Sequence, residues 1–497
     1  MLMCSNFFVE VSMRSICFFL SRSAASLRRL NAALLSVALL AFCAHSQAAD
    51  LYSEADLAVA KQAMAQAQQS DLAYELVASL TTEVGPRPAG SAGDAAAVAW
   101  AKAKLTALGF DRVWTEPVRI NAWARGPARA EIIAPFPQQL AITALGNSIS
   151  TPAEGITAEV AYYENFEALK DDTSTRANGR IVYIDNNMER ARDGSGYGKA
   201  VPARGNGAVE AAKRGALAVV IRSIGTDHDR LPHTGGMRYD DKVTKIPAAA
   251  VSTPDGDLIR RQVQSKLPVK ISLFMQNTAR SNLESFNVLA EMRGTDKPEQ
   301  IVAIGAHLDS WDLGTGAIDD GAGVAITVAT AKILRDVSAN LGVKAKRTIR
   351  VVLFANEENG FDGAFEYSRV HGNDKHQLVA EADSGAGLIY QVETGVSEAS
   401  LPWLRELGPL LAPLKIDIAG NTGKASSDLG DIGAKFNLPA VSMRQDASKY
   451  FDIHHTANDT LDKIDPLELK QNVAAWTAMV WLAVQAGVDF AGAPKKN

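Results

Sequence analysis

The sequence predicts an α/β protein: a mostly parallel, twisted sheet sandwiched by helices, with a smaller α/β unit inserted before most of its strands. Short, continuous apolar runs are typical of strands that are covered on both faces. Five such runs occur at residues 288–292, 301–306, 349–355, 387–392 and 440–443. Helix-like segments such as residues 323–337 separate them. Strands that alternate with helices indicate crossover connections, and therefore a layered α/β architecture.

The first fifty residues predict an export signal. Arg28 and Arg29 precede an apolar stretch at residues 30–44, and small residues follow at Ala48 and Ala49. Basic, apolar and small residues in this order are typical of a secretory leader, and the stretch is shorter than the ~20 residues that span a bilayer. We therefore expect residues 1–49 to be removed, no stable membrane span to remain, and the mature protein to be periplasmic or secreted.

Several alternatives stay open at this end of the chain. The first alternative to a removable leader is an uncleaved membrane anchor. Translation starts at either Met1 or Met13. The helical segment at residues 51–69 is either part of the fold or a short propeptide. The sequence does not choose between a monomer and a homodimer.

Cysteine usage and charge exclude several classes of protein. All three cysteines, Cys4, Cys17 and Cys43, lie in the predicted leader. The mature chain would therefore have no disulfide, cysteine nucleophile or thiolate metal ligand. The formal net charge is −5, and loss of four Arg and one Glu with the leader changes it to −8, from 47 basic and 55 acidic residues. Such an acidic chain is a poor candidate for binding nucleic acid.

The pattern of predicted helices and strands divides the mature chain into three segments. Residues 50–130 contain two predicted helices and form the N-terminal part of the main domain. Residues 131–280 carry short strand-like runs around a predicted helix at residues 208–214, so we expect an inserted domain. Its strands are predicted at residues 180–185, 217–222 and 246–251. Residues 281–497 complete the main domain and end in a predicted helix at residues 467–488.

Polar residues gather where the predicted strands of the main domain end, which is where open α/β sheets place their sites. Five groups stand out: His307 with Asp309, Asp319 with Asp320, Glu357 with Glu358, Glu381 with Asp383, and His454 with His455. Each group alone is more simply explained as a helix cap or a solvated turn. Together, two imidazoles and three carboxylates give each of two zinc ions three ligands when one carboxylate is shared, and they leave positions for water.

The other histidines of the mature chain receive a plainer interpretation. His371 and His376 lie in a charged stretch, and His228 and His233 lie in the predicted inserted domain. We expect all four to be surface residues.

Once these groups are placed in order, the chain resembles the carboxypeptidase Q-like di-zinc exopeptidases, a family that also includes bacterial leucyl aminopeptidases. The resemblance covers nearly the whole mature chain, and its motifs are specific in combination. They include residues 306–312, 319–321, 357–358, 381–383 and 449–456, and a loop at residues 85–91. The middle segment resembles a protease-associated domain.

The resemblance implies a role for each residue. It places His307 and Asp383 on one zinc ion, Glu358 and His455 on the other, and Asp319 between them. Glu357 matches the general base, and Asp309 the aspartate that supports the metal ligands. His455 rather than His454 is the implied ligand because the ligand of this family directly precedes Thr or Ser. Aminopeptidase members have a tyrosine at the position of His454, so the group that stabilises the oxyanion stays open.

The resemblance to this family also implies the reaction: hydrolysis of short peptides or dipeptides with free termini. A hydroxide bridging the two ions would attack the peptide carbonyl, and Glu357 would transfer the proton to the leaving amine. Side-chain preference, and which end of the peptide is read, are not determined by the sequence. Two rival functions remain: a non-catalytic receptor-like protein on the same fold, and a single-zinc acyltransferase of the glutaminyl cyclase type.

Overall fold

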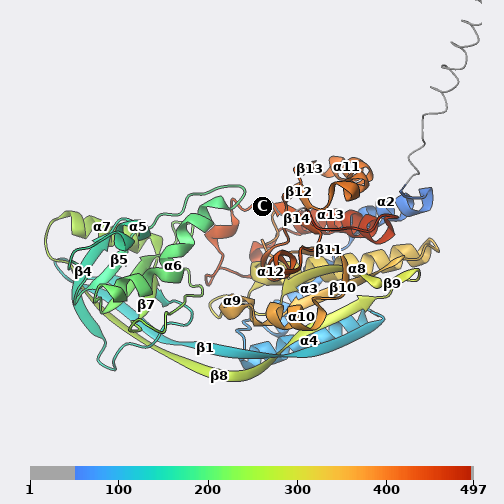
Figure 1. Ribbon diagram of the computed structural model, residues 1–497. Coiled ribbons are helices and arrows are strands. Elements are labelled where there is room, and N and C mark those ends of the chain that lie inside the picture. Colours follow the sequence, from blue (N-terminus) through green and yellow to red (C-terminus); the bar gives the residue numbers. More distant parts are fainter. Residues whose placement is uncertain (1–50, 494–497) are drawn as a thin grey trace, which may run out of the picture. The chain divides into compact units, whose positions relative to one another are not determined.

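The computed structural model describes residues 51–493, so the predicted leader at residues 1–49 lies outside the described residues. One mixed sheet path runs through this part of the chain (Figure 1). In sheet order its first strands are β13 (Asp417–Ile418), β12 (Ile389–Gly395), β14 (Ala440–Gln445), β11 (Lys375–Glu381), β9 (Lys297–His307), β10 (Arg347–Phe354) and β8 (Lys270–Met292). The neighbours β14, β11, β9 and β10 are all parallel to one another.

Helices cover both faces of these strands, which confirms the predicted α/β class. One face is covered by α2 (Glu54–Gln69), α3 (Leu72–Glu83), α4 (Ala92–Ala107), α8 (Ala322–Asn340), α11 (Leu404–Leu411) and α13 (Pro466–Gln485). The other is covered by α10 (Asp362–His371) and α12 (Ser427–Phe436). Residues of β9 alternate between the two cores, since Ile304 faces α8 and Ala303 faces α12. This two-sided burial explains why the strands appear as unbroken apolar runs.

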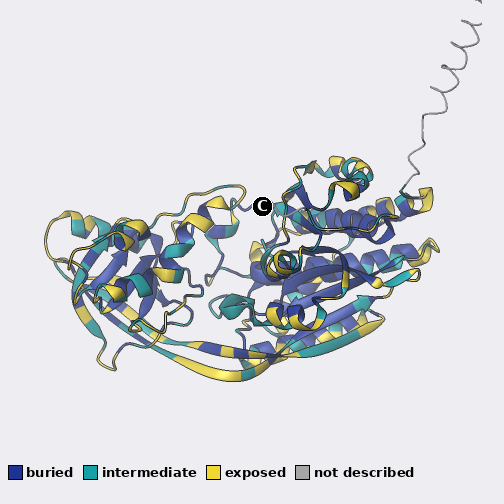
Figure 2. Ribbon diagram, in the orientation of Figure 1, coloured by how far each residue is buried: buried dark blue, intermediate teal, exposed yellow. Residues whose placement is uncertain are grey.

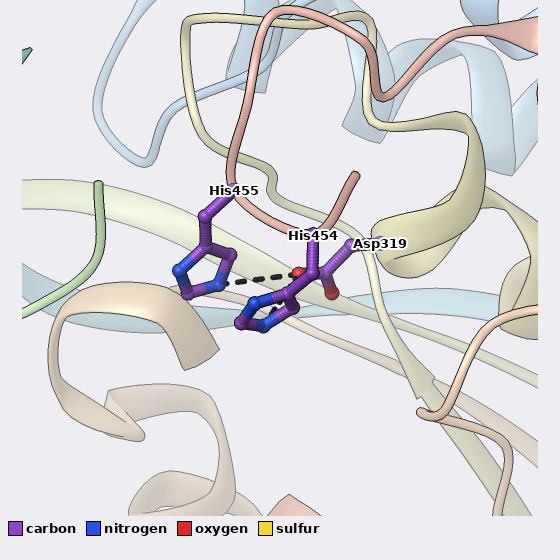
Figure 3. A group of neighbouring side chains, drawn as sticks. All are labelled: Asp319, His454 and His455. Atoms are coloured by element: carbon purple, nitrogen blue, oxygen red, sulfur yellow. Dashed lines mark ion pairs between the residues drawn. The ribbon is translucent and has the colours of Figure 1, made fainter. Parts of the chain in front are cut away.

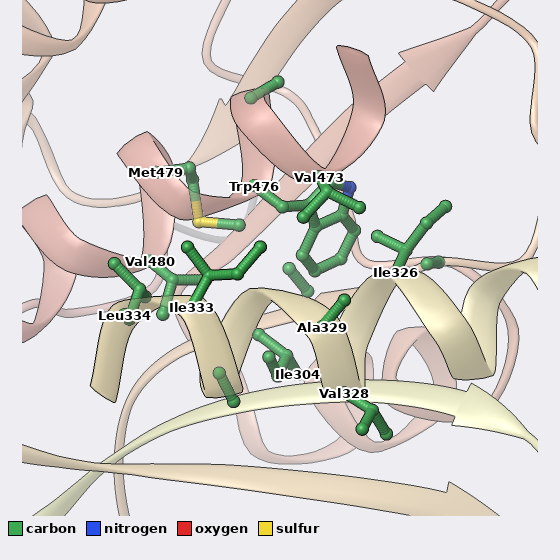
Figure 4. Close-up of a cluster of buried hydrophobic side chains, with 14 of the residues drawn as sticks. Ile304, Ile326, Val328, Ala329, Ile333, Leu334, Val473, Trp476, Met479 and Val480 are labelled. Atoms are coloured by element: carbon green, nitrogen blue, oxygen red, sulfur yellow. The ribbon is translucent and has the colours of Figure 1, made fainter. Parts of the chain in front are cut away.

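The packing of α8 against α13 anchors the larger core. Figure 4 shows Ile326, Ile333 and Leu334 of α8 interleaved with Trp476 and Val480 of α13 above the sheet. All five side chains are at most 5% exposed. A buried aromatic or branched side chain contributes about 1.5 to 3 kcal/mol of transfer free energy, so this contact is a main source of stability. No helix within residues 51–493 is long and apolar enough to cross a membrane.

Beyond β8 the sheet path continues into a second group of strands with its own cores. They are β4 (Ile156–Tyr163), β5 (Ile181–Ile184), β6 (Ala218–Arg222), β7 (Ala248–Val251) and β3 (Ile142–Ala144), with helices α5 (Phe166–Lys170), α6 (Ser195–Lys213) and α7 (Thr253–Gln264). Strands β4, β5, β6 and β7 are parallel. These elements lie within residues 131–280, although the domain boundaries themselves stay predictions.

A long antiparallel ribbon, β1 (Arg112–Ala134) paired with β8, joins the two groups of strands (Figure 1). The short β2 (Gln138–Leu140) folds back and pairs antiparallel with the end of β1. In the middle of the ribbon residues 278–282 of β8 are exposed and mostly polar, as Figure 2 illustrates, whereas β1 alternates there between exposed and buried residues. The sequence predicted only the buried end of β8, because an exposed polar strand lacks the apolar run on which that prediction depended.

Two of the four histidines expected at the surface are buried, so that prediction was wrong for them. His233 is 1% exposed and His376 is 5% exposed, whereas His228 is exposed and His371 is partly buried. His376 is the second residue of β11, and its Nε2 lies 2.9 Å from the hydroxyl oxygen of buried Tyr367. Polarity along the chain did not reveal this burial, because a hydrogen bond from a distant element satisfies the imidazole.

Burial of His376 predicts an acid-dependent loss of stability. Burial, followed by the charge of Arg350, lowers the pKa of His376 from 6.5 to about 4. Between pH 6.5 and 4 the unfolded chain therefore binds a proton that the folded chain does not, so stability falls as the pH falls through this window. We expect His376→Gln to reduce the loss of unfolding free energy between pH 7 and pH 5 by about 2 kcal/mol. Urea titrations at both pH values measure this, and an unchanged difference would contradict it.

Candidate metal centre

The candidate residues converge because four neighbouring parallel strands end at the same edge of the sheet. His307 is the last residue of β9, and Glu357 and Glu358 follow β10 in the short helix α9 (Glu357–Gly360). Asp383 follows β11, and the turn that carries His454 and His455 follows β14. The sheet therefore brings residues up to 148 positions apart, from 307 to 455, into one cluster.

Asp319 lies at the centre of this cluster, and its two carboxylate oxygens face different imidazoles. Its Oδ1 lies 3.1 Å from Nε2 of His307, and the same nitrogen lies 3.6 Å from Oδ1 of Asp383. Its Oδ2 lies 3.2 Å from Nε2 of His455, which in turn lies 3.1 Å from Oε2 of Glu358. Two sets of groups, one on each side, therefore share one carboxylate.

His454 lies beside this arrangement and approaches the same carboxylate. Figure 3 shows His454 and His455 both directed toward Asp319. Their rings stack with centroids 3.5 Å apart, and Nε2 of His454 lies 3.5 Å from Asp319 Oδ2. Either imidazole is thus near enough to Asp319 to share a cation with it. The geometry leaves the choice of His455 as the ligand a prediction, and His455 is the one that also contacts Glu358.

Hydrogen bonds to main-chain carbonyls fix the tautomers of the two implied ligands. Nδ1 of His307 lies 3.1 Å from the carbonyl oxygen of Asp309, and Nδ1 of His455 lies 3.2 Å from that of Thr234. A carbonyl only accepts, so both Nδ1 atoms carry hydrogen. The lone pair of each neutral ring is then on Nε2, facing carboxylate oxygens. Such a contact requires a proton or a metal ion between the two groups.

The electrostatics of the cluster also call for cations. Burial disfavours the charged form of His307, but the nearby carboxylates of Asp309, Asp319 and Asp383 outweigh burial and hold its pKa well above the usual value. Burial raises the pKa of Glu358, and nearby Asp319 adds to this effect. Oε1 of Glu358 is buried without a hydrogen-bond partner among the described residues. Nitrogen and oxygen donors with an excess of negative charge are the ligand set of zinc, so these residues fit the predicted metal.

Asp309 and Ser427 position the predicted general base, Glu357. The carboxylate of Asp309 accepts the backbone N–H groups of Glu357 at 3.0 Å and Glu358 at 3.4 Å. It lies farther from His307, at 3.7 Å from Nδ1. The hydroxyl of Ser427 donates to Oε1 of Glu357. Burial raises the pKa of Glu357 well above its usual value, even though His307 lowers it. Within residues 51–493 no imidazole forms an ion pair with Glu357, whereas His455 lies 3.1 Å from Glu358.

Two predicted polar residues support the cluster instead of facing it. The carboxylate of Asp320 accepts the backbone N–H of His307 at 3.1 Å and that of Gly323 at 3.1 Å. Glu381 accepts the backbone N–H of Leu429 at 2.8 Å and so joins β11 to α12. Both are buried, and both hold main chain in place near the site.

Arg87 and Asp459 hold the loop that carries Asp319, and neither was assigned a role from the sequence. Arg87 is fully buried and donates to the carbonyls of Leu308 at 2.6 Å, Thr315 at 2.7 Å and Gly316 at 2.8 Å. Asp459 accepts the backbone N–H of Ile318 at 2.6 Å. In the sequence Arg87 is only one residue of the loop at residues 85–91 that contributes to the family resemblance, and sequence alone does not show that its guanidinium reaches so far along the chain.

The middle segment of the chain reaches into the site through a loop before β7. Thr234 donates its N–H to the carbonyl of His455 at 3.0 Å, while its own carbonyl lies against Nδ1 of that residue. Nδ1 of His233 lies 2.7 Å from the carbonyl oxygen of His454, and its Nε2 lies 2.7 Å from Oδ1 of Asp227. The turn that carries the two histidines is therefore fixed from the middle segment as well as from the sheet.

A cavity of about 1020 Å³ opens onto the cluster. Asp319, Glu357, Glu358, Asp383, His454 and His455 line one side of it. Residues of α6 and of the loop before β7 line another side, including Tyr197, Arg204 and Met237. The cavity is large enough for a short peptide. A buried cluster of this composition beside such a cavity defines the class: a metal-dependent hydrolase on an α/β sheet.

The comparisons with known proteins identify the family within this class. Residues 287–480 match the model of peptidase family M28. Human carboxypeptidase Q is 36% identical over 82% of this chain and 84% of its own length, and aminopeptidase YwaD of Bacillus subtilis is 24% identical over 83% and 84%. The chain therefore belongs to peptidase family M28, and it is a metallo-exopeptidase similar to carboxypeptidase Q.

Solved structures agree with this assignment. A peptidase M28 precursor from Shewanella amazonensis has a TM-score of 0.86 and 48% identity, over 89% of this chain and 99% of that one. A zinc aminopeptidase from Bacillus subtilis shares the fold, with a TM-score of 0.60 at 19% identity over 83% and 95% of the two chains. These findings confirm the predicted family and fold.

We expect removal of the Arg87 guanidinium to loosen the metal centre. Arg87→Met leaves three buried carbonyls without donors, and each buried unpaired group costs about 1 to 3 kcal/mol. The variant should lose at least about 3 kcal/mol of unfolding free energy in urea. It should also yield its metal to a chelator at lower concentration than the parent. Arg119→Met is the matched control, because that exposed side chain makes only a 3.7 Å ion pair with Glu284. Equal behaviour of the two variants would contradict the role of Arg87.

Proposed function

We propose that the protein is a two-zinc exopeptidase that hydrolyses short peptides, dipeptides above all, with free termini. The observation that carries the proposal is the position of Asp319, whose two oxygens face His307 with Asp383 on one side and His455 with Glu358 on the other. One carboxylate shared in this way supports three protein ligands for each of two ions. Zinc ions bound there would supply Lewis-acid polarisation of the peptide carbonyl and activation of a water molecule.

The chain's own residues would provide the proton transfers. Glu357 faces the cavity, carries a raised pKa because of its burial, and is oriented by Ser427 and by Asp309. It is therefore suited to take a proton from the attacking water and to deliver one to the leaving amine. Asp309 acts through the main chain of Glu357 and Glu358 as a positioning residue.

The geometry disfavours the two rival functions. A single-zinc acyltransferase needs ligands on only one side of Asp319, whereas this chain has an imidazole and a carboxylate on each side. A receptor-like protein has no need for a buried carboxylate such as Glu357 on a cavity wall, since keeping it there costs desolvation free energy.

Replacing the proposed base tests the mechanism. Glu357→Gln keeps the shape of the side chain but removes its ability to accept a proton, so turnover of leucyl-leucine should fall by about 10²- to 10⁴-fold. Zinc content should be unchanged, because Glu357 contacts neither imidazole. Initial rates and elemental analysis measure the two quantities. Glu284→Gln, on the exposed ribbon, is the control. A Glu357→Gln variant as active as this control would exclude Glu357 as the base.

Metal removal tests the number of zinc ions. A chelator should abolish dipeptide hydrolysis, and titration of zinc back into the metal-free protein should restore full activity only near two equivalents per chain. We expect Asp383→Asn to weaken one of the two binding steps selectively, since Asp383 lies against His307 and not His455. Calorimetric titration resolves the steps. Full activity at one equivalent would favour the single-zinc alternative.

A further inference from the structure

A buried arginine with no acidic partner among the described residues lines the cavity onto which the metal cluster opens. Arg204 lies on α6 and is only 8% exposed. Within residues 51–493, no carboxylate forms an ion pair with it, and its Nε is buried without a hydrogen-bond partner. Keeping a charged guanidinium out of water is unfavourable unless an anion compensates it. A ligand that brings a carboxylate into the cavity would provide that anion.

The surroundings hold the Arg204 guanidinium at a defined place in the cavity. Its NH2 group donates to the hydroxyl of Tyr197, seven residues earlier on α6, at 2.6 Å. Gly235 lies against the other side, where a Cβ atom would come within 2.4 Å of NH1 and 2.6 Å of Cζ. The glycine therefore makes room for the guanidinium, which a side chain at this position would displace.

Arg204 is separated from the metal cluster by a single aromatic ring. The ring of Tyr197 lies 5.2 Å from that of His454, centroid to centroid, and Nε2 of His454 lies 3.5 Å from Asp319. In a dipeptide the terminal carboxylate is three bonds beyond the scissile carbonyl carbon, and each further residue adds at most ~3.6 Å. A substrate with one residue between its scissile bond and its terminal carboxylate therefore matches the short separation between the metal cluster and Arg204.

The other basic residues of the cavity are less suitable. Arg444 is already paired with Glu393, while Arg238 and Lys424 are exposed, so water compensates their charges. Arg204 is thus the buried basic residue among the four that line the cavity. A guanidinium also offers parallel N–H groups that match the two oxygens of a carboxylate.

We propose that Arg204 binds the C-terminal carboxylate of the substrate and so makes the enzyme read the carboxyl end, with one residue beyond the scissile bond. This inference rests on the proposed peptidase function and adds the anchor and the direction of reading. The middle segment then contributes to specificity directly, because Arg204, Tyr197 and Gly235 all belong to it.

The test compares two substrates that differ only at the carboxyl end, leucyl-leucine and leucyl-leucinamide. The parent enzyme should prefer the free acid, and Arg204→Met should lower kcat/KM for the acid by about 10- to 100-fold, mainly through KM. The rate with the amide should stay within about threefold, since the amide has no charge to lose. Arg238→Met and Lys424→Met, which remove exposed charges from the same cavity, should leave the ratio of the two rates unchanged.

A second variant, Arg204→Lys, distinguishes loss of the carboxylate contact from a folding defect. Arg204→Lys keeps the charge but loses the paired N–H groups, so it should show the same change in ratio at reduced size. Calorimetric titration of leucyl-leucine into the zinc-loaded Glu357→Gln protein, with and without Arg204→Met, measures binding without turnover. An equal loss on both substrates, or no preference of the parent for the acid, would overturn the role of Arg204 while leaving the peptidase proposal intact. A parent enzyme that cleaves neither substrate would overturn both.

Discussion

The carboxylate of Asp319, set between two imidazoles, is the contact on which the rest of the site depends. Both rings present a nitrogen lone pair to carboxylate oxygens, because their other nitrogen is already committed to a carbonyl. Bringing so many acids together in a buried place is unfavourable without compensating cations. Arg87 and Asp459 restrain the cluster, because both form hydrogen bonds with the main chain around Asp319.

Sheet topology is what makes this contact possible. His307, Glu358 and Asp383 each follow a different strand, and those strands are direct neighbours in the order β11, β9 and β10. Parallel neighbours end on the same side, so side chains separated by long stretches of sequence need no special loop to meet. The rigid, two-sided core beneath these strands then limits how far the ligands can move apart, as the burial of Ile304 and Trp476 illustrates.

Sequence reasoning succeeded where a signal is local and failed where it depends on a distant partner. Apolar runs revealed β9 and β10, and motifs at their ends revealed His307 and Glu357. The strand β11 was missed because its apolar centre, Leu378 to Ala380, is too short to stand out between polar neighbours. His233 looked like a surface residue, yet it is buried because Asp227 and the carbonyl of His454 satisfy its ring. Such burial is decided by tertiary contacts that no window of sequence contains.

The middle segment is therefore part of the site rather than an appendage to it. Thr234 fixes the tautomer of His455, and His233 holds the carbonyl of His454, so the two histidines that approach Asp319 depend on a loop outside the sheet. Arg204 lies on the helix that faces the same cavity. A shift of the segment would change the position of an imidazole and of the carboxylate anchor together. The proposed catalytic site and the proposed substrate anchor therefore share one support, because the loop at residues 233–235 contacts the histidine turn on one side and Arg204 on the other.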